Sequence, residues 1–332
     1  MIDAPLMLAI PHLPLLRLQL CFRVLSPIVL PPCRGSLWKG VLGAHLARNP
    51  MRSVNGGTLY GMLIDPRPED CLALPSGGER PAPLVLDMPG QIEPGQTLGQ
   101  WQLVPTLAEP DEQLILGLTL FGQAAALAGL VVDTLATAAK EGLGSRVNGN
   151  PRGTAELQSV SHFSPQGDLI ALRSPSQLEG LVAEAPVVPN FAGPVFEVDV
   201  VTPLRLERHD GARKIVCLPN ELRAPYVFSA MISRIANLAA CHAGQHIDTK
   251  GFRERTQKIE FASQDLGFAD QSRHSRSQER DIPLGGVIGN FSLDLSDYED
   301  VIPWLHLAQF THVGKGTIMG MGSLRISGAA KV

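Results

Sequence analysis

The chain has 332 residues, of which 44% are hydrophobic and 18% are charged, and its formal net charge is −4. This composition excludes a disordered or fibrous chain and argues against a protein that coats nucleic acid without specificity, and the length predicts two domains of ~100–200 residues. No Asp or Glu occurs between Ala4 and Ile64, where every charged residue is Arg or Lys, and none occurs after Asp300. If the fold brings the two ends together, they form a basic cleft on an acidic body.

The amino terminus and the cysteines indicate the compartment. The apolar run before residue 18 contains Asp3, lacks a basic start and is interrupted by three prolines, so it predicts neither a signal peptide nor a membrane span. The five cysteines form no CxxC pair and are odd in number, which is typical of reduced thiols. We therefore expect a cytoplasmic protein without a membrane segment or a zinc site.

The first half of the sequence predicts strands and helices around a loop-rich region. Residues 16–25 alternate as a strand does, and residues 36–48 have the apolar spacing of a helix with Ser36 as its N-cap. Proline and glycine are dense from residue 49 to residue 113, which predicts loops around a strand pair with candidates at 58–64 and 83–88. The elements expected next are a strand at 112–122, an alanine-rich helix at 123–142 and a strand at 154–163.

The second half predicts the same order after a proline-rich linker near 185–194. The expected elements are a strand at 195–208, a helix at 222–244, strands at 258–268 and 285–296, a short helix at 297–311 and a last strand at 319–327. Two βαββαβ units predict an α+β protein with two tandem ferredoxin-like (RRM-like) domains and antiparallel sheets. We place these domains at 1–188, with the loop-rich insertion, and at 189–332, with a glycine-rich loop.

That glycine-rich loop lies within HVGKGTIMGMGSLRIS, residues 312–327. A dinucleotide-binding fingerprint needs a following helix, and a P-loop needs Ser or Thr after GK, whereas Lys315 is followed by Gly316 and then by a strand. What remains is a helix-to-strand connection in which glycines allow another backbone to approach closely. Its successive N–H groups can accept phosphate oxygens beside Lys315, and a simple flexible turn is the alternative.

Two segments carry a family resemblance. DQSRHSRSQERDIPLGGVIGNF (270–291) and LHLAQFTHVGKGTIMGMGSLRI (305–326) resemble the C-terminal domain of the CRISPR-associated endoribonucleases that process precursor CRISPR RNA, in the RAMP superfamily. Members of that superfamily are usually built from two ferredoxin-like domains. RGSLWKGVLGAHLAR (34–48) resembles the first helix of the family only loosely. Many relatives carry a cysteine cluster near residues 58–65, and this chain has only Cys71 nearby, so no metal knuckle is expected.

The resemblance implies metal-independent RNA cleavage. In the family the 2′-hydroxyl attacks the scissile phosphate and leaves a 2′,3′-cyclic phosphate, which requires a base, an acid and positive charge, and histidine suits the first two tasks. His45 lies in the helix where relatives often carry a catalytic histidine, although it also borders the apolar stripe as a packed histidine would. His312 is a second catalytic candidate or a support for the loop. Lys39 is a candidate for the positive charge, on a different helical face from His45.

Basic residues and loop glycines are the candidates for holding RNA. Arg273, Arg276 and Arg280 would form one stripe in a helical turn, unless neighbouring acids neutralise them. The residues expected to bind RNA are Arg34, Arg273, Arg276, Arg280, Gly314, Lys315, Gly316, Gly320, Gly322 and Arg325.

The resemblance also implies the partners. We expect CRISPR repeat RNA or guide RNA as the ligand, subunits of a CRISPR effector complex as protein partners, and no cofactor, metal or membrane. The alternative is a RAMP-type subunit that binds guide RNA without cleaving it.

Overall fold

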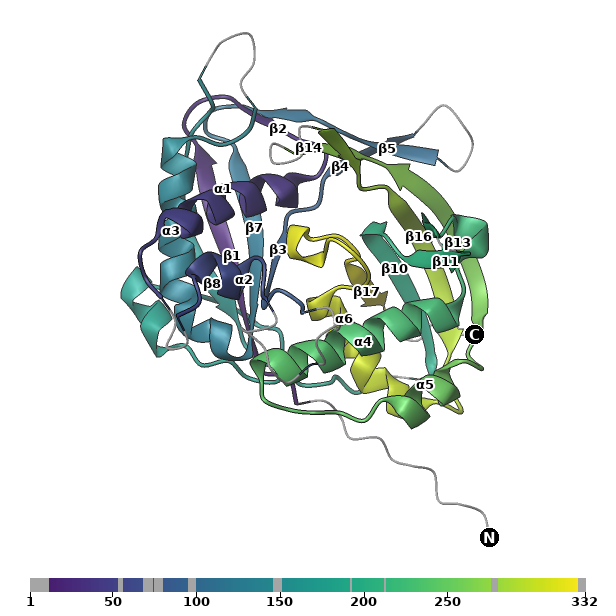
Figure 1. Cartoon of the computed structure of the whole chain (residues 1–332). Coiled ribbons are helices and arrows are strands. Elements are labelled where there is room, and N and C mark those ends of the chain that lie inside the picture. Colours follow the sequence, from purple (N-terminus) through teal and green to yellow (C-terminus); the bar gives the residue numbers. More distant parts are fainter. Residues whose placement is uncertain are drawn as a thin grey trace.

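The computed structural model describes residues 12–52, 56–67, 74, 80–94, 100–145, 151–191, 193–211, 213–275 and 280–327. Arg276 and Cys71 lie outside these ranges. Two sheets lie side by side, each with helices packed against it, and the C-terminal loop lies between them (Figure 1). The expected α+β fold with two tandem ferredoxin-like domains is confirmed.

The first domain is an antiparallel sheet with the strand order β3-β7-β1-β8-β9. Its strands are β1 (Leu15–Val24), β3 (Leu84–Asp87), β7 (Gln113–Phe121), β8 (Ala155–Phe163) and β9 (Leu169–Ala171). Even-numbered residues from Leu16 to Val24 are buried in the first core, where α1 (Arg34–Arg48) and α3 (Ala128–Glu141) cover the sheet. Without the edge strand β9, this is the strand order of a ferredoxin-like domain.

The second domain repeats the arrangement with the order β17-β10-β16-β13. Its elements are β10 (Val195–Leu204), α4 (Ala224–His242), α5 (Lys250–Thr256), β13 (Phe261–Asp270), β16 (Gly286–Asp294), α6 (Ile302–Thr311) and β17 (Leu324–Ser327). Trp304 of α6 stacks on Phe252 of α5 with ring centroids 4.7 Å apart, and α4 and α6 bury their apolar faces on the sheet.

The loop-rich insertion ties the two domains together. β4 (Gln91–Pro94) and β5 (Gln100–Val104) form a hairpin, and β5 pairs in parallel with β13 of the second domain. This hairpin is not the strand pair expected from the sequence: of the two candidates, residues 83–88 contain β3, which pairs with β7, and residues 58–64 form no strand. The β4–β5 hairpin instead extends the sheet of the other domain. The guanidinium of Arg17 makes a further link, because it lies 4.1 Å from the ring centroid of Phe163 and 4.5 Å from that of Phe310 in α6.

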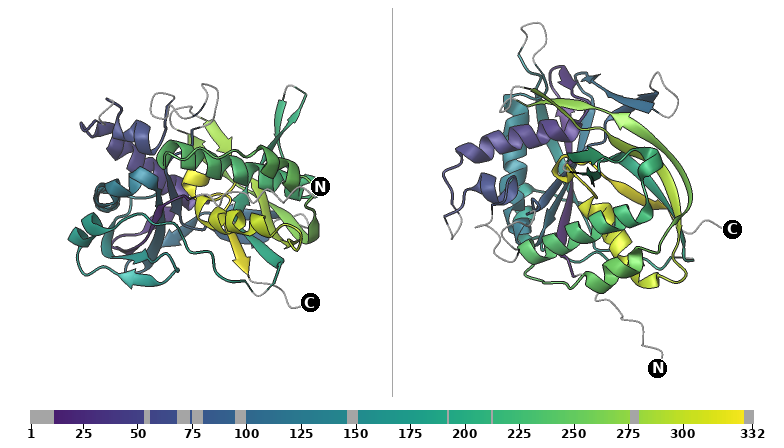
Figure 2. Two further views of the ribbon diagram at one scale, coloured as in Figure 1. Left: turned by 90° about the horizontal axis from the view of Figure 1, so that it is seen from below. Right: turned by 45° about the vertical axis from the view of Figure 1, so that its right-hand side comes forward.

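The smaller elements complete the described chain. They are β2 (Ile28–Leu30), α2 (Leu59–Leu63), β6 (Thr106–Ala108), β11 (Glu207–Asp210), β12 (Arg213–Val216), β14 (Ser272–Ser275) and β15 (Arg280–Pro283). The 3₁₀ turns are η2 (Gly122–Leu127), η3 (Pro175–Gly180), η4 (Pro219–Glu221), η5 (Glu299–Val301) and η6 (Thr317–Met319). Figure 2 shows from two further sides that the sheets stand beside each other.

Three local predictions are wrong. Residues 58–64, expected as a strand, contain α2, whose N-cap Thr58 accepts a 2.9 Å hydrogen bond from the amide of Gly61. Ser36 is not the N-cap of α1: the helix begins at Arg34, and the Ser36 hydroxyl donates to the carbonyl of Cys33. The segment around Arg273 and Arg280 is the hairpin β14–β15 rather than a helical turn.

Two further observations concern the compartment. The helical stretch Gly122–Glu141 is long and apolar enough to span a membrane by length and composition, but 44% of its apolar window is buried inside the protein, where Val131, Val132 and Leu135 belong to the first core. Cys241 in α4 is disulfide-bonded, whereas Cys21, Cys33 and Cys217 are free thiols. The expectation of reduced thiols throughout is therefore wrong for Cys241.

Candidate functional site

The glycine-rich loop follows α6 and lies between the two domains. All four glycines have positive φ, and two of them show why no side chain fits. A Cβ on Gly320 would lie 2.8 Å from the carbonyl oxygen of Leu86 in β3, and one on Gly322 would lie 1.8 Å from that of Val313. The glycines therefore let the loop pack directly on the backbone of the first domain and on itself.

Many of the loop amides are already used inside the protein. The N–H groups of Lys315, Gly320 and Gly322 donate to the carbonyls of Arg205, Thr317 and Pro203 at 2.9, 2.9 and 3.1 Å. These three amides cannot serve a phosphate at the same time. Fewer backbone N–H groups are therefore available to bind a phosphate than the spacing of the glycines suggests.

The first turn of α1 meets the loop. A Cβ on Gly35 would lie only 2.0 Å from the carbonyl oxygen of Met319. Beside it, Arg34 is half-buried, donates a 2.9 Å hydrogen bond to the Thr106 hydroxyl, and has its pKa lowered by burial. The fold thus brings the acid-free N-terminal segment against the acid-free C-terminal loop.

A cationic pocket of about 300 Å³ opens beside the loop. Lys315 and Gly314 line it from the loop, Ser233, Arg234 and Asn237 from α4, and Arg205 and Lys214 from the segment after β10 and from β12. Glu207 is the acid in the lining, and Arg205 faces it with 3.7 Å between nitrogen and oxygen. The pocket has the charge and size for phosphate groups.

Of these lining residues, only Gly314 and Lys315 are expected from the sequence to bind RNA. The others are separated along the chain, so no local motif joins them. One signal was available, because Ser233, Arg234 and Asn237 form a cluster of polar positions in a helix that is mostly apolar.

His312 lies beneath the loop rather than facing solvent. It caps α6 with φ 58°, is 2% exposed, and places Nδ1 3.2 Å from the Met321 carbonyl oxygen. Burial, reinforced by the positive charge of Arg234, lowers the pKa of His312 to about 3. A buried neutral ring cannot exchange protons with a substrate, so the geometry favours loop support over the catalytic role also considered for His312.

His45 lies near the far end of α1. Its Nδ1 is 2.9 Å from the carbonyl oxygen of Val41, and its Nε2 is 3.0 Å from Glu141 Oε2 at the end of α3. The side chain is 22% exposed. Ten helical residues separate it from Gly35, a distance of ~15 Å, so the structure does not bring His45 to the loop.

Lys39 is partly buried and lies one helical turn after Gly35, the residue of α1 that contacts the loop. It is separated from His45 by ~9 Å along the helix axis and by about 120° around it. Arg48, exposed three residues after His45, lies on the same side of α1 as that histidine. Arg48 is not among the residues expected from the sequence to form the site.

The remaining arginines divide between two places. Arg273 and Arg280 belong to the β14–β15 hairpin. The base of this hairpin packs on the loop, because Ile282 and Leu284 form one apolar cluster with Met319 and Met321. Arg325 of β17 lies opposite Asp199 of β10 in the strand register. Its side chain is on the sheet face opposite the helices and so points away from the pocket.

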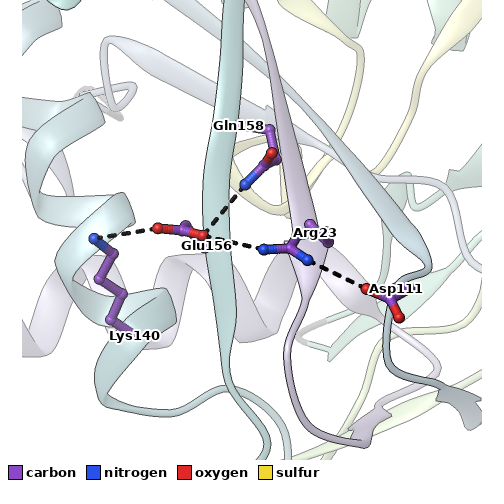
Figure 3. Close-up of polar contacts among 5 residues, drawn as sticks. All are labelled: Arg23, Asp111, Lys140, Glu156 and Gln158. Carbon is purple, nitrogen blue, oxygen red and sulfur yellow. Dashed lines mark hydrogen bonds and ion pairs between the residues drawn. The ribbon is translucent and has the colours of Figure 1, made fainter.

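Not every basic residue of the acid-free N-terminal segment is available to an anion. Figure 3 shows Arg23 between two carboxylates, with Asp111 at 3.3 Å and Glu156 at 3.5 Å. Glu156 also accepts a hydrogen bond from Gln158 and lies 4.0 Å from the ammonium of Lys140. The positive charge of Arg23 is therefore locally neutralised.

No group of three or more His, Cys, Asp or Glu that could hold a metal ion occurs among the described residues. A second cavity, of about 500 Å³, lies between β1, the β8–β9 turn and α6, and none of the selected residues lines it.

These features define a class: a tandem ferredoxin-like protein with a glycine-rich loop and a cationic pocket at the domain junction. Residues 13–185 match a family model described as an N-terminal domain (AF_1859_N), and residues 198–324 match the model of the CRISPR-associated endoribonuclease Cas6. The second domain, over residues 198–324, belongs to the Cas6 family of CRISPR-associated endoribonucleases. The expected recognition and enzyme class are confirmed.

Solved structures of Cas6 proteins share the fold. The product complex of Thermus thermophilus Cas6 (TTHB231) superposes with a TM-score of 0.54 at 16% identity, over 95% of this chain and 99% of that one. A partial Cas6-RT-Cas1–Cas2 complex gives a TM-score of 0.57 at 14% identity, over 98% of this chain but 48% of the longer one. No curated protein sequence matches the chain.

Proposed function

We propose that this chain cleaves precursor CRISPR RNA within its repeats, without a metal ion, to give guide RNA. The observation that carries the proposal is the cationic pocket beside the glycine-rich loop, in a chain whose second domain matches an endoribonuclease family. Phosphate contacts by Lys and Arg position an RNA without reading its sequence, and hairpin shape supplies much of the rest.

The proposed site has a holding part and a cutting part. The holding part is the loop with its pocket, the first turn of α1 and the β14–β15 hairpin. It comprises Arg34, Lys39, Arg273, Arg280, Gly314, Lys315, Gly316, Gly320 and Gly322, to which the pocket adds Arg205, Lys214 and Arg234. The cutting part is His45 with Arg48, and His45 lies ~15 Å along α1 from Gly35 in the holding part.

The reaction is an in-line transesterification. The 2′-oxygen forms a bond to the scissile phosphorus, the bond from phosphorus to the 5′-oxygen breaks, and the products carry a 2′,3′-cyclic phosphate and a 5′-hydroxyl. The 2′-hydroxyl loses its proton to water, and the leaving 5′-oxygen takes a proton from the His45 ring. General acid catalysis of this kind contributes roughly 10²–10⁴-fold.

Protein partners are proposed to be other CRISPR proteins. A chain of similar fold is part of a Cas6-RT-Cas1–Cas2 complex, in which the matching region makes up 48% of the chain. We propose that this chain likewise stays with its RNA product beside other subunits.

One observation favours a second candidate function. Both ring nitrogens of His45 already have partners in the RNA-free protein. A packed histidine of this kind is compatible with a RAMP-type subunit that binds guide RNA without cutting it.

Incubation with the cognate repeat RNA in EDTA tests the proposal. Cleavage that yields a cyclic phosphate supports the endoribonuclease, tight binding without cleavage supports the guide-binding subunit, and absence of RNA affinity contradicts both. His45→Ala should slow single-turnover cleavage ~100-fold or more and leave the Kd for RNA unchanged. If this variant cleaves at the wild-type rate, His45 is not a catalytic residue.

A further inference from the structure

His45 is held from both sides by oxygen atoms that accept hydrogen bonds. Its Nδ1 faces the carbonyl oxygen of Val41 at 2.9 Å, one helical turn back along α1. Its Nε2 faces Oε2 of Glu141 at 3.0 Å, on the neighbouring helix α3. The two contacts fix both the position of the ring and the plane in which it lies.

These partners also determine which ring nitrogens carry protons. A backbone carbonyl oxygen only accepts hydrogen bonds, so Nδ1 must donate to Val41. An ionised carboxylate likewise only accepts, so Nε2 must donate to Glu141. Both contacts are satisfied together only by the doubly protonated ring. Glu141 therefore favours a His45 that carries a proton on Nε2.

We infer that Glu141 is a positioning residue for RNA cleavage: it holds the His45 ring in its orientation and keeps on Nε2 the proton that the leaving 5′-oxygen receives. The inference rests on the proposed function, since it gives His45 the role of acid. It assigns a role to a side chain 96 residues away in the sequence.

The geometry also explains how Nε2 can be released to the RNA. Glu141 is the last residue of α3, is followed by Gly142 with φ 138°, and has a side chain that is 60% exposed. Its carboxylate can therefore swing away when the scissile phosphate arrives. The bond from Nδ1 to Val41 lies within α1 and keeps the ring in place. Nε2 then gives its proton to the 5′-oxygen as the phosphorus–oxygen bond breaks.

A purely structural role for the contact makes different predictions. If the pair only joins α1 to α3, its loss should lower the melting temperature, and any slowing of cleavage should be accounted for by that lost stability or by weaker RNA binding. If Glu141 acts through His45, its loss should slow cleavage only while His45 is present.

The test compares Glu141→Gln, His45→Ala and the double variant with the full-length wild-type protein, in single-turnover cleavage of the repeat RNA. Glu141→Gln replaces the carboxylate with a neutral amide of the same shape. We expect it to slow cleavage about tenfold, to leave the Kd for RNA unchanged, and to add nothing to the effect of His45→Ala.

Glu156→Gln is the matched control. Glu156 is a second carboxylate beside the end of α3, paired with Lys140 and Arg23 and not with His45 (Figure 3). This variant should cleave at the wild-type rate. Thermal melting of both Gln variants separates lost stability from lost chemistry.

¹⁵N NMR of histidine-labelled protein supplies an independent readout. The Nε2 resonance of His45 should show an N–H that is hydrogen-bonded to a carboxylate in the wild type, and Glu141→Gln should shift or abolish that signal. The outcomes separate the two proposals. A wild-type rate for Glu141→Gln beside an inactive His45→Ala overturns the positioning role alone. A wild-type rate for His45→Ala overturns the catalytic assignment and this inference with it.

Discussion

Gly35 in α1 and Met319 in the glycine-rich loop are in direct backbone contact, although they lie near opposite ends of the chain. A Cβ on Gly35 would lie 2.0 Å from the carbonyl oxygen of Met319 and 2.9 Å from that of Leu86. Backbone atoms cannot give way as a flexible side chain can. This contact fixes the loop against the first domain and so sets the shape of the holding part of the site.

Gly35→Ala should therefore force the loop away from α1. We expect a loss of about 1–3 kcal/mol in the free energy of unfolding, measured by urea denaturation, together with weaker RNA binding. Gly40→Ala is the control, because it lies on the same helix with nothing within 4 Å of the added Cβ. That variant should be as stable as the wild type or gain up to about 1 kcal/mol. Equal stability of the two variants would contradict the tight contact.

Lys214 and Lys315 are predicted to contribute charge to the RNA contact. Replacing either by Ala should weaken RNA binding at 50–200 mM salt, an ordinary working range, and reduce the slope of log affinity against log salt by about one. Lys258→Ala serves as the control, because Lys258 is an exposed lysine that does not line the pocket. An unchanged slope in both pocket variants would mean that the RNA does not enter the pocket.

Asp87 at the end of β3 gives a pH prediction. Burial raises the pKa of this carboxyl to about 6, although Arg17 and Arg325 act in the opposite direction. Because the pKa is higher in the folded state than the unfolded value of ~3.9, the folded protein binds the extra proton, and stability falls as pH rises from about 4 to 6. Asp87→Asn should remove that fall, which amounts to roughly 3 kcal/mol.

The measurement is urea denaturation of wild type and Asp87→Asn at pH 4.5 and pH 7. Other groups titrate in both proteins, so only the difference between the two pH dependences reports on Asp87. If both proteins change equally with pH, the carboxyl is not protonated preferentially in the folded state.

His312 gives a prediction of the opposite sign. Its pKa in the folded protein is about 3, below the unfolded value of ~6.5, so the unfolded chain binds the extra proton between these values. Stability should therefore fall by up to about 1.4 kcal/mol for each unit of pH below 6.5, through this group alone. In acid denaturation, the stability of His312→Gln should lack the part of the pH dependence that is due to His312.

The same variant tests the catalytic candidate role of His312. If His312 supports the loop, cleavage by folded His312→Gln should fall only as far as RNA binding falls. A variant that binds RNA with the wild-type Kd and does not cleave would restore His312 as a catalytic residue.

The order of strands and helices could be predicted because each element carries a local pattern. Alternation in β1 and the apolar spacing of α4 mark these elements without knowledge of their neighbours. Residues 58–64 were misjudged because a five-residue helix is too short for its period to emerge, and the Thr58 cap decides the local structure. The hairpin at Arg273 was misjudged for a related reason: three arginines at helical spacing say nothing about strand pairing.

The sequence by itself determined that there are two βαββαβ units, that glycines crowd the last loop, and that the chain resembles RNA-processing endoribonucleases. Only the tertiary structure decided which side chains meet. It joined β5 to the sheet of the other domain, assembled the pocket from α4, β12 and the loop, buried His312 and set Glu141 against His45. Periodicity reports which face of an element is buried, whereas contacts between distant residues depend on how the two domains pack, and no local pattern records that.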